Sequence, residues 1–194
     1  MSKIIPLKSL VSILLVSLVL ILGSIKILSG FYPGRSKIAA SDIELVSQEG
    51  VKTPYSTLSD KPKLVFFGFT HCPSICPAAL ANISATLDII GDDAKKLHVI
   101  FVTTDPERDD PTTLKTYISN FNANIKGYTG RKDELKKIYK KYYVYTEDAP
   151  AGQTEYDLNH STIIYLVGED GELIDHYESD ADPQEMAKAI EAHI

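Results

Sequence analysis

The feature that most limits the possible folds is the apolar run KLVFFGF at residues 63–69, which leads directly into two cysteines and a helical pattern. Neighbouring side chains of a strand point to opposite faces, so a continuous apolar run predicts a strand buried on both sides. The next segment, residues 78–90, carries apolar residues at helical spacing, at Leu80, Ile83, Leu87 and Ile90. A buried strand followed by a helix is typical of an α/β protein with a parallel sheet.

The remaining patterns predict a mixed sheet flanked by helices. We expect two short strands in residues 42–58, a second buried strand at 97–105, helices at 112–121 and 131–143, a hairpin at 161–179 and a last helix at 182–194. The expected order is hairpin, strand, helix, strand, helix, helix, hairpin, helix. A strand, cysteines and a helix, with a hairpin and a helix at the end, form a thioredoxin-like arrangement.

The charge distribution divides the chain into a basic start and an acidic remainder. The 194 residues carry a net charge of −6, and residues 1–40 contain five basic residues and no acid, which leaves −11 for the rest. Nucleic-acid binding depends on Lys and Arg neutralising phosphates. We therefore expect no nucleic-acid partner.

The basic start contains a candidate membrane anchor. Residues 9–25 carry no charge over 17 positions, and the apolar character resumes after Lys26. A span needs about 20 residues to cross roughly 30 Å of hydrocarbon. A cleaved signal peptide is the alternative, but its apolar part is shorter and a cleavage site would follow it more closely than Ala39 and Ala40 do. We predict an N-terminal transmembrane anchor at residues 1–32, a linker at 33–41 and an exported domain at 42–194.

The two cysteines, Cys72 and Cys76, are the only ones in the chain. They lie where a strand meets a helix N-terminus, whose free N–H groups and dipole stabilise a thiolate. A disulfide between them would close a loop of five residues and contribute only about 2 kcal/mol to stability. The spacing therefore favours a redox pair or part of a metal site over a structural staple.

A metal held by two thiolates needs a further ligand, and the chain offers five histidines. His160 is the strongest candidate, because it lies in YDLNHSTIIYLV between a long loop and a strand, and loops at strand ends commonly carry sites. In a thioredoxin-like arrangement this point lies beside the loop that carries the cysteines. We expect His71 to point elsewhere and His98 to belong to a strand. The last two, His176 and His193, are expected at the surface.

Three motifs, FGFTHCPSICP, TTDPERDDP and LNHSTIIYLVGEDGELIDHY, occur in this order after one apolar segment. Together they resemble the Sco/SenC family of copper proteins over roughly residues 42–194. C-x-x-x-C-P with a distant histidine before a hairpin is specific, whereas C-x-x-x-C alone would be weak. The resemblance implies a thioredoxin-like fold on a single membrane anchor. It also implies a role in assembling the CuA centre of cytochrome c oxidase.

Carried over residue by residue, the resemblance places the family's copper ligands at Cys72, Cys76 and His160. It also implies that Cys72 and Cys76 form a redox-active disulfide when they hold no metal. Two thiolates and one imidazole suit Cu(I), which accepts soft donors and low coordination, and Cu(II) is a second candidate ion. The implied partner is subunit II of cytochrome c oxidase at its CuA site, with another copper chaperone as a second candidate partner.

The resemblance also indicates residues that would support the site. The motif DPERDDP resembles the family's Asp-Pro-Glu-Arg-Asp-Thr-Pro, so Asp105 and Arg108 are expected to order the loop that carries the cysteines. A capped turn between a strand and a helix is the plainer alternative. The chain departs from the family at Asp110, where Thr is common, and at Asn159, where Asp often precedes the histidine. The second departure bears on how the imidazole is oriented.

The combined prediction is a membrane-anchored copper metallochaperone for the CuA centre, not an enzyme. The alternative is a thiol–disulfide oxidoreductase acting on the CuA cysteines or on other exported thiols, which would need both cysteines but not His160. A peroxidase-like enzyme on the same fold is disfavoured by the two-cysteine helix motif.

The expected location is the bacterial inner membrane with the domain in the periplasm, because the chain lacks an Arg- and Ser-rich transit peptide. The alternative is the mitochondrial inner membrane, with the domain facing the intermembrane space.

Overall fold

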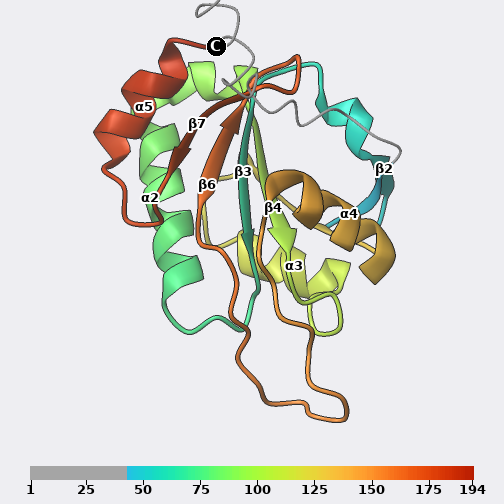
Figure 1. Ribbon diagram of the computed structural model, residues 1–194. Coiled ribbons are helices and arrows are strands. Elements are labelled where there is room, and N and C mark those ends of the chain that lie inside the picture. The colour runs from blue at the N-terminus through green and yellow to red at the C-terminus, as the bar shows by residue number, and fades with distance from the viewer. Residues whose placement is uncertain (1–42) are drawn as a thin grey trace, which may run out of the picture. The chain divides into compact units, whose positions relative to one another are not determined.

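The two continuous apolar runs form the centre of a mixed sheet. The computed structural model describes residues 43–194, in which seven strands form one sheet with helices on both faces (Figure 1). The strands are Glu44–Ser47 (β1), Lys52–Pro54 (β2), Lys63–Gly68 (β3), His98–Thr103 (β4), Ile125–Thr129 (β5), Ile164–Val167 (β6) and Leu173–Tyr177 (β7). The helices are Ile75–Ile90 (α2), Pro111–Ile118 (α3), Lys132–Tyr142 (α4) and Pro183–Glu191 (α5), with short 3-10 helices at Tyr55–Leu58 (η1) and Gly91–Lys96 (η2).

The strand order is β2-β1-β5-β4-β3-β6-β7. The pairs β3–β4 and β4–β5 are parallel, and the other neighbours are antiparallel. Every residue of β3 is buried, as the apolar run predicts. The predicted α/β class, with a mixed sheet flanked by helices, is confirmed.

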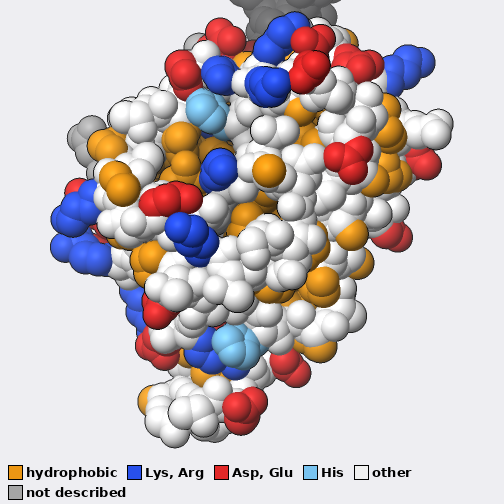
Figure 2. All heavy atoms as spheres, turned by 180° about the vertical axis from the view of Figure 1, so that it is seen from behind, with side chains coloured by type: hydrophobic (Ala, Val, Ile, Leu, Met, Phe, Trp, Pro, Cys, Tyr) orange, Lys and Arg blue, Asp and Glu red, His pale blue; other side chains and the backbone are white. Residues whose placement is uncertain are grey.

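Alternate residues of β3 enter two separate cores. Leu64 and Phe66 belong to the core under α2, α3 and α5. Val65 and Phe67 belong to the core under α4 and η1. On the face shown in Figure 2, side chains of both charges are interspersed, and apolar side chains show only in small groups between them. The two faces of β3 therefore position α2, which carries Cys76, and α4, which precedes the loop that carries His160.

The predicted order of elements was wrong between the two middle helices, where the structure contains β5. This strand, IKGYT, pairs with β4 on one side and β1 on the other. Lys126 is exposed, and Gly127 leaves room for Ile118 and Leu114 of α3, which would lie 3.2 and 3.4 Å from a Cβ there. A five-residue strand containing a lysine and a glycine shows no apolar run, and its burial comes from the neighbouring strands and from α3.

Both predicted hairpins and the predicted last helix are confirmed. Gly50 and Gly171 adopt positive φ of 77° and 78° in the turns of β1–β2 and β6–β7, a conformation that glycine adopts without steric cost. The Asp182 carboxylate accepts hydrogen bonds from the backbone N–H groups of Gln184 and Glu185 at the start of α5.

The predicted anchor at residues 1–32 and linker at 33–41 lie outside the described residues. Within residues 43–194, no helix has both the length and the apolar composition that a membrane span requires.

Candidate metal centre

The two cysteines approach each other at the junction of β3 and α2. Cys72 is half-buried in the loop of residues 69–74, here called the cysteine loop, and Cys76 is fully buried in the first turn of α2. A Cβ at residue 68 would lie 2.8 Å from Cys76 Sγ and 3.0 Å from Phe101 Cε2. Gly68 therefore lets the Cys76 sulfur lie directly over the end of β3. The sequence analysis missed this role, for which a glycine at the end of a buried strand was the available signal.

His160 completes the group from the opposite side. It lies in the loop of residues 143–163, here called the histidine loop, and pairs with Thr146 in an isolated β-bridge. Its Nε2 lies 3.5 Å from Cys76 Sγ. Its Nδ1 lies 2.8 Å from the Ser161 carbonyl oxygen, which can only accept a hydrogen bond, so Nδ1 carries the proton in the neutral ring. The Nε2 lone pair therefore faces the sulfurs.

The three candidate ligand atoms of Cys72, Cys76 and His160 all lie within 4.8 Å of one another. In residues 43–194 this is the only group of three or more His, Cys, Asp or Glu side chains with such a geometry. Two sulfurs and one imidazole nitrogen suit a soft or borderline ion. The residues singled out from the sequence are thus brought together and could hold one metal ion.

The other four histidines lie apart from this group. His71 is exposed, and its Nδ1 lies 3.1 Å from the Thr70 hydroxyl. His98 contacts Asp60 at 2.6 Å at the start of β4. The remaining two are exposed, as expected from the sequence: His176 and His193.

The two sulfurs differ in charge. The Cys76 side chain donates toward Cys72, and this contact, together with the backbone N–H groups of Cys76 and Ser74, lowers the pKa of Cys72 to about 3. The contact with Cys72 and burial raise the pKa of Cys76. Cys72 is therefore a thiolate at neutral pH and Cys76 a thiol, and a metal that binds both must displace the Cys76 proton.

A buried carboxylate, Asp109, ties the cysteine loop to the sheet. It is fully buried, and burial raises its pKa. It accepts hydrogen bonds from the backbone N–H of Thr70 at 3.0 Å, from the Thr70 hydroxyl at 2.6 Å and from the Thr103 hydroxyl at 2.6 Å. Thr70 lies two residues before Cys72, so Asp109 sets the path of the loop. The sequence analysis did not single out this residue.

Asp105 and Arg108 connect the histidine loop to the cysteine loop. The buried Asp105 carboxylate accepts a hydrogen bond from Arg108 Nε at 2.5 Å and from the Tyr156 hydroxyl at 2.8 Å. The Arg108 guanidinium lies over the Tyr156 ring, 3.6 Å from its centroid, and 5.8 Å from the centroid of Phe69. Tyr156 belongs to the histidine loop and Phe69 to the cysteine loop. The guanidinium thus lies between the two loops that supply the candidate ligands.

The two departures from the family motif have clear structural contexts. Asp110 caps α3 by accepting a hydrogen bond from the Thr113 N–H at 2.7 Å, a position where Asp and Thr are both favoured. The Asn159 amide donates to the Glu147 carboxylate at 3.1 Å rather than to the imidazole. It pairs the two ends of the histidine loop, while the Ser161 carbonyl orients the ring.

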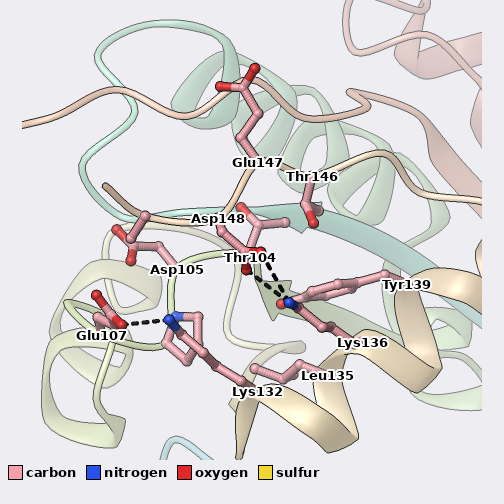
Figure 3. A pocket seen from close by; sticks show the side chains of 12 residues that line it. Thr104, Asp105, Glu107, Lys132, Leu135, Lys136, Tyr139, Thr146, Glu147 and Asp148 are labelled. Carbon is pink, nitrogen blue, oxygen red and sulfur yellow. Dashed lines mark hydrogen bonds and ion pairs between the residues drawn. The ribbon is translucent and has the colours of Figure 1, made fainter. Parts of the chain in front are cut away.

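A small cavity lies between α4 and the histidine loop (Figure 3). Ion pairs flank it, Lys136 with Asp148 at 3.0 Å and Lys132 with Glu107 at 2.5 Å. Its volume of about 20 Å³ is enough for one water molecule, not for an organic ligand. The buried Thr104 hydroxyl lines it without a hydrogen-bond partner among the described residues. The residues around this cavity therefore help to hold the histidine loop against α4.

Comparison with known proteins identifies the family of this chain. The model of the SCO1/SenC family matches residues 33–194. The chain belongs to the SCO1/SenC family. This SCO1/SenC protein is 31% identical over 160 residues to the mitochondrial SCO2 homolog of Danio rerio, a match that covers 81% of this chain and 57% of that protein. It therefore spans less than two thirds of the length of that relative.

Two solved structures of SCO1/SenC proteins share the fold. ScoI of Bradyrhizobium japonicum with copper bound superimposes with a TM-score of 0.73 at 35% identity, over 80% of this chain and 99% of that chain. Yeast Sco1 with copper bound gives a TM-score of 0.70 at 32% identity, over 79% of this chain and 87% of that chain. The expected thioredoxin-like Sco fold is thus confirmed, and the relatives include both mitochondrial and bacterial proteins.

Proposed function

We propose that this SCO1/SenC protein is a copper metallochaperone that holds Cu(I) through Cys72, Cys76 and His160. The observation that carries the proposal is the convergence of three ligand atoms within 4.8 Å. The two copper-bound relatives of the same fold support copper as the cargo. Cu(II) is a second candidate cargo, because the imidazole adds a harder donor to the sulfurs.

The protonation of the site suits the capture of a soft cation. Cys72 supplies a thiolate, and His160 offers an Nε2 lone pair that the Nδ1 contact with Ser161 fixes in place. Cys76 becomes a ligand as its proton leaves. Since Cys72 is half-exposed, an incoming ligand of a partner can reach the ion, and a three-coordinate ion leaves room for that exchange.

The proposed destination is the CuA site of cytochrome c oxidase subunit II. The proposed setting is a single-pass anchor at residues 1–32 in the bacterial inner membrane, with the domain facing the periplasm. A copper transfer assay tests the destination: the copper-loaded chain is mixed with the copper-free CuA domain of subunit II. Appearance of the CuA absorption spectrum supports delivery, and retention of all copper on this chain contradicts it.

The alternative is a thiol–disulfide oxidoreductase, favoured by the thiolate character of Cys72 beside a buried thiol. That activity needs both cysteines but not His160. Competition for Cu(I) against a chromophoric chelator separates the two functions, with the full-length reduced chain compared with His160→Ala. The exposed His176 provides the matched control, His176→Ala.

We expect one tight equivalent of Cu(I) in the wild type and in His176→Ala, and binding weakened at least about tenfold, or roughly 1.4 kcal/mol, in His160→Ala. Equal affinity of wild type and His160→Ala would remove the imidazole from the site and favour the oxidoreductase.

A further inference from the structure

Tyr156 joins the histidine loop to the turn between β4 and α3 by two separate contacts. Its hydroxyl donates a hydrogen bond to Asp105 Oδ1 at 2.8 Å, and its ring centroid lies 3.6 Å from Arg108 Cζ. Tyr156 is half-buried, whereas residues 151–155 and Asp157 on either side of it are exposed. The two contacts therefore hold the outer part of the histidine loop in place.

The contact with the guanidinium continues to the imidazole of the candidate centre. Arg108 Cζ lies 5.8 Å from the centroid of the buried Phe69 ring, within the range of a cation–π interaction. The Phe69 ring meets the His160 ring edge-on, with centroids 5.6 Å apart. Tyr156 and His160 lie in the same loop, so the series of contacts that leaves the loop at Tyr156 returns to it at His160.

The middle members of this series are fixed by their own surroundings. The Arg108 side chain is 13% exposed and pairs with the fully buried Asp105 carboxylate at 2.5 Å. Separating such a pair would leave a buried charge uncompensated, so the guanidinium resists displacement. Phe69 belongs to the cysteine loop, and its carbonyl accepts a hydrogen bond from the Cys72 N–H at 3.3 Å. The Phe69 ring is therefore a fixed surface against which the imidazole packs.

We infer that Tyr156 is a positioning residue for the candidate metal centre, which keeps the His160 imidazole beside the sulfurs. It acts through the Arg108 guanidinium and the Phe69 ring rather than on the ion. His160 Nε2 lies 3.5 Å from Cys76 Sγ, and a metal–nitrogen bond is only about 2 Å long, so a small movement of the loop takes the nitrogen out of reach of the ion. The inference deepens the proposed function and rests on it, because it assigns what holds the third ligand.

A double-mutant cycle shows whether Tyr156 acts through His160. Cu(I) competition is measured on the full-length reduced chain for the wild type, Tyr156→Ala, His160→Ala and the double variant. We expect Tyr156→Ala to weaken Cu(I) binding about fivefold in the wild-type background, and by less than about twofold where His160 is already absent. A ring that only supports the overall structure would weaken binding by the same factor in both backgrounds, and that result would overturn the inference.

Two further variants separate the contacts of Tyr156 from a general effect of changing the loop. Tyr156→Phe keeps the ring beside the guanidinium and loses only the hydroxyl, so its Cu(I) affinity should stay within about threefold of the wild type. Tyr143→Ala is the matched control, because Tyr143 belongs to the same loop and is 80% exposed. An equal loss of affinity in Tyr143→Ala and Tyr156→Ala would overturn the inference. If Tyr156→Ala does not fold, Tyr156→Leu, which fills similar space without an aromatic face, takes its place in the cycle.

The position of the imidazole can also be measured without copper, in the reduced state that the structure describes. Diethyl pyrocarbonate modifies neutral imidazoles, and peptide mass spectrometry gives the rate at each histidine. Because His160 Nε2 faces the sulfurs, the ring must swing outward to react, and the exposed His176 of the same molecule serves as the reference.

We expect the rate at His160, relative to that at His176, to rise about fivefold in Tyr156→Ala and to stay at the wild-type value in Tyr143→Ala. Equal relative rates in the wild type and Tyr156→Ala would overturn the inference. Because this measurement contains no copper, a wild type that binds no copper would refute the proposed function and leave the Tyr156 comparison readable.

Discussion

Single residues set the charge of the candidate centre before any ion arrives. The contact from Cys76 and the N–H groups at the start of α2 favour the Cys72 thiolate, while the buried Cys76 keeps its proton. The half-buried Cys72 sulfur is thus the nucleophile, and the buried Cys76 sulfur is the one that keeps its proton. The same asymmetry would serve metal capture and thiol exchange.

This asymmetry predicts an unusual pH dependence of alkylation. Because the pKa of Cys72 is lowered to about 3, its thiolate persists as the pH falls from 8 to about 5, and its reaction with iodoacetamide should slow only slightly. Cys76, with a raised pKa, should react slowly throughout. Peptide mass spectrometry of the metal-free chain distinguishes the sites. A Cys72 rate that falls tenfold for each pH unit below 8 would contradict the assignment.

Asp109 should matter for stability more than an exposed acid does. Asp109→Ala leaves three donors without their acceptor, the buried Thr103 hydroxyl and the partly buried N–H and hydroxyl of Thr70, at a cost of about 3 kcal/mol. Asp109→Asn keeps one acceptor oxygen and should lose less. Urea denaturation measures both, with Asp93→Ala on the surface of η2 as the control. Equal stability of Asp109→Ala and Asp93→Ala would show that the network contributes nothing.

For single residues, the sequence identifies the candidate metal ligands more readily than the residues that hold those ligands in place. Cysteine and histidine have few other reasons to occur in such motifs, so Cys72, Cys76 and His160 could be singled out. Asp109 looks like one of several acids in a turn, and Tyr156 like any residue of a polar loop. Their roles arise from contacts between segments 39 and 51 residues apart, which no local pattern records.

Among the elements, the contact between β3 and α2 determines the geometry of the sulfurs. Gly68→Ala would place a methyl group 2.8 Å from Cys76 Sγ and 3.0 Å from Phe101, and neither neighbour lies at the end of a flexible chain. We expect a loss of about 1–3 kcal/mol in stability from this overpacking, with weaker copper binding because Cys76 is displaced.

Gly130→Ala is the matched control for that substitution. The nearest neighbours of its new methyl group would be the Glu44 carbonyl oxygen and Leu135, at ordinary contact distances of 3.4 Å and more. Chemical denaturation and Cu(I) competition are run on both variants. If Gly68→Ala keeps wild-type stability and wild-type Cu(I) affinity, the junction of β3 and α2 accommodates the methyl group and the prediction is wrong.

Strand β5, which the sequence patterns did not predict, shows why some strands cannot be recognised from one sequence. β3 and β4 are recognisable because burial on both faces demands apolar residues at every position. β5 is also interior, between β1 and β4, yet Lys126 reaches solvent and Gly127 makes space for α3. Its strand character comes from its neighbours and not from its own residues.

For the whole molecule, the proposal couples an exported domain to a membrane anchor at residues 1–32. The full-length chain should stay with the membrane fraction after washing with high salt and with alkaline carbonate, because an apolar span is held by the hydrophobic effect and not by charge. A chain that begins at residue 33 should be released. Recovery of the full-length chain in the wash, or a mature protein shortened at its N-terminus, would contradict a retained anchor.

The central claim is that one copper ion is held by two sulfurs and one imidazole nitrogen. X-ray absorption spectroscopy of the chain loaded with one equivalent of Cu(I) tests this most directly, since it counts the atoms bound to the metal. We predict two sulfur neighbours and one nitrogen neighbour in the wild type, and the loss of the nitrogen alone in His160→Ala. A copper ion with two sulfur neighbours and no nitrogen in the wild type, or a spectrum unchanged by His160→Ala, would contradict the three-ligand centre.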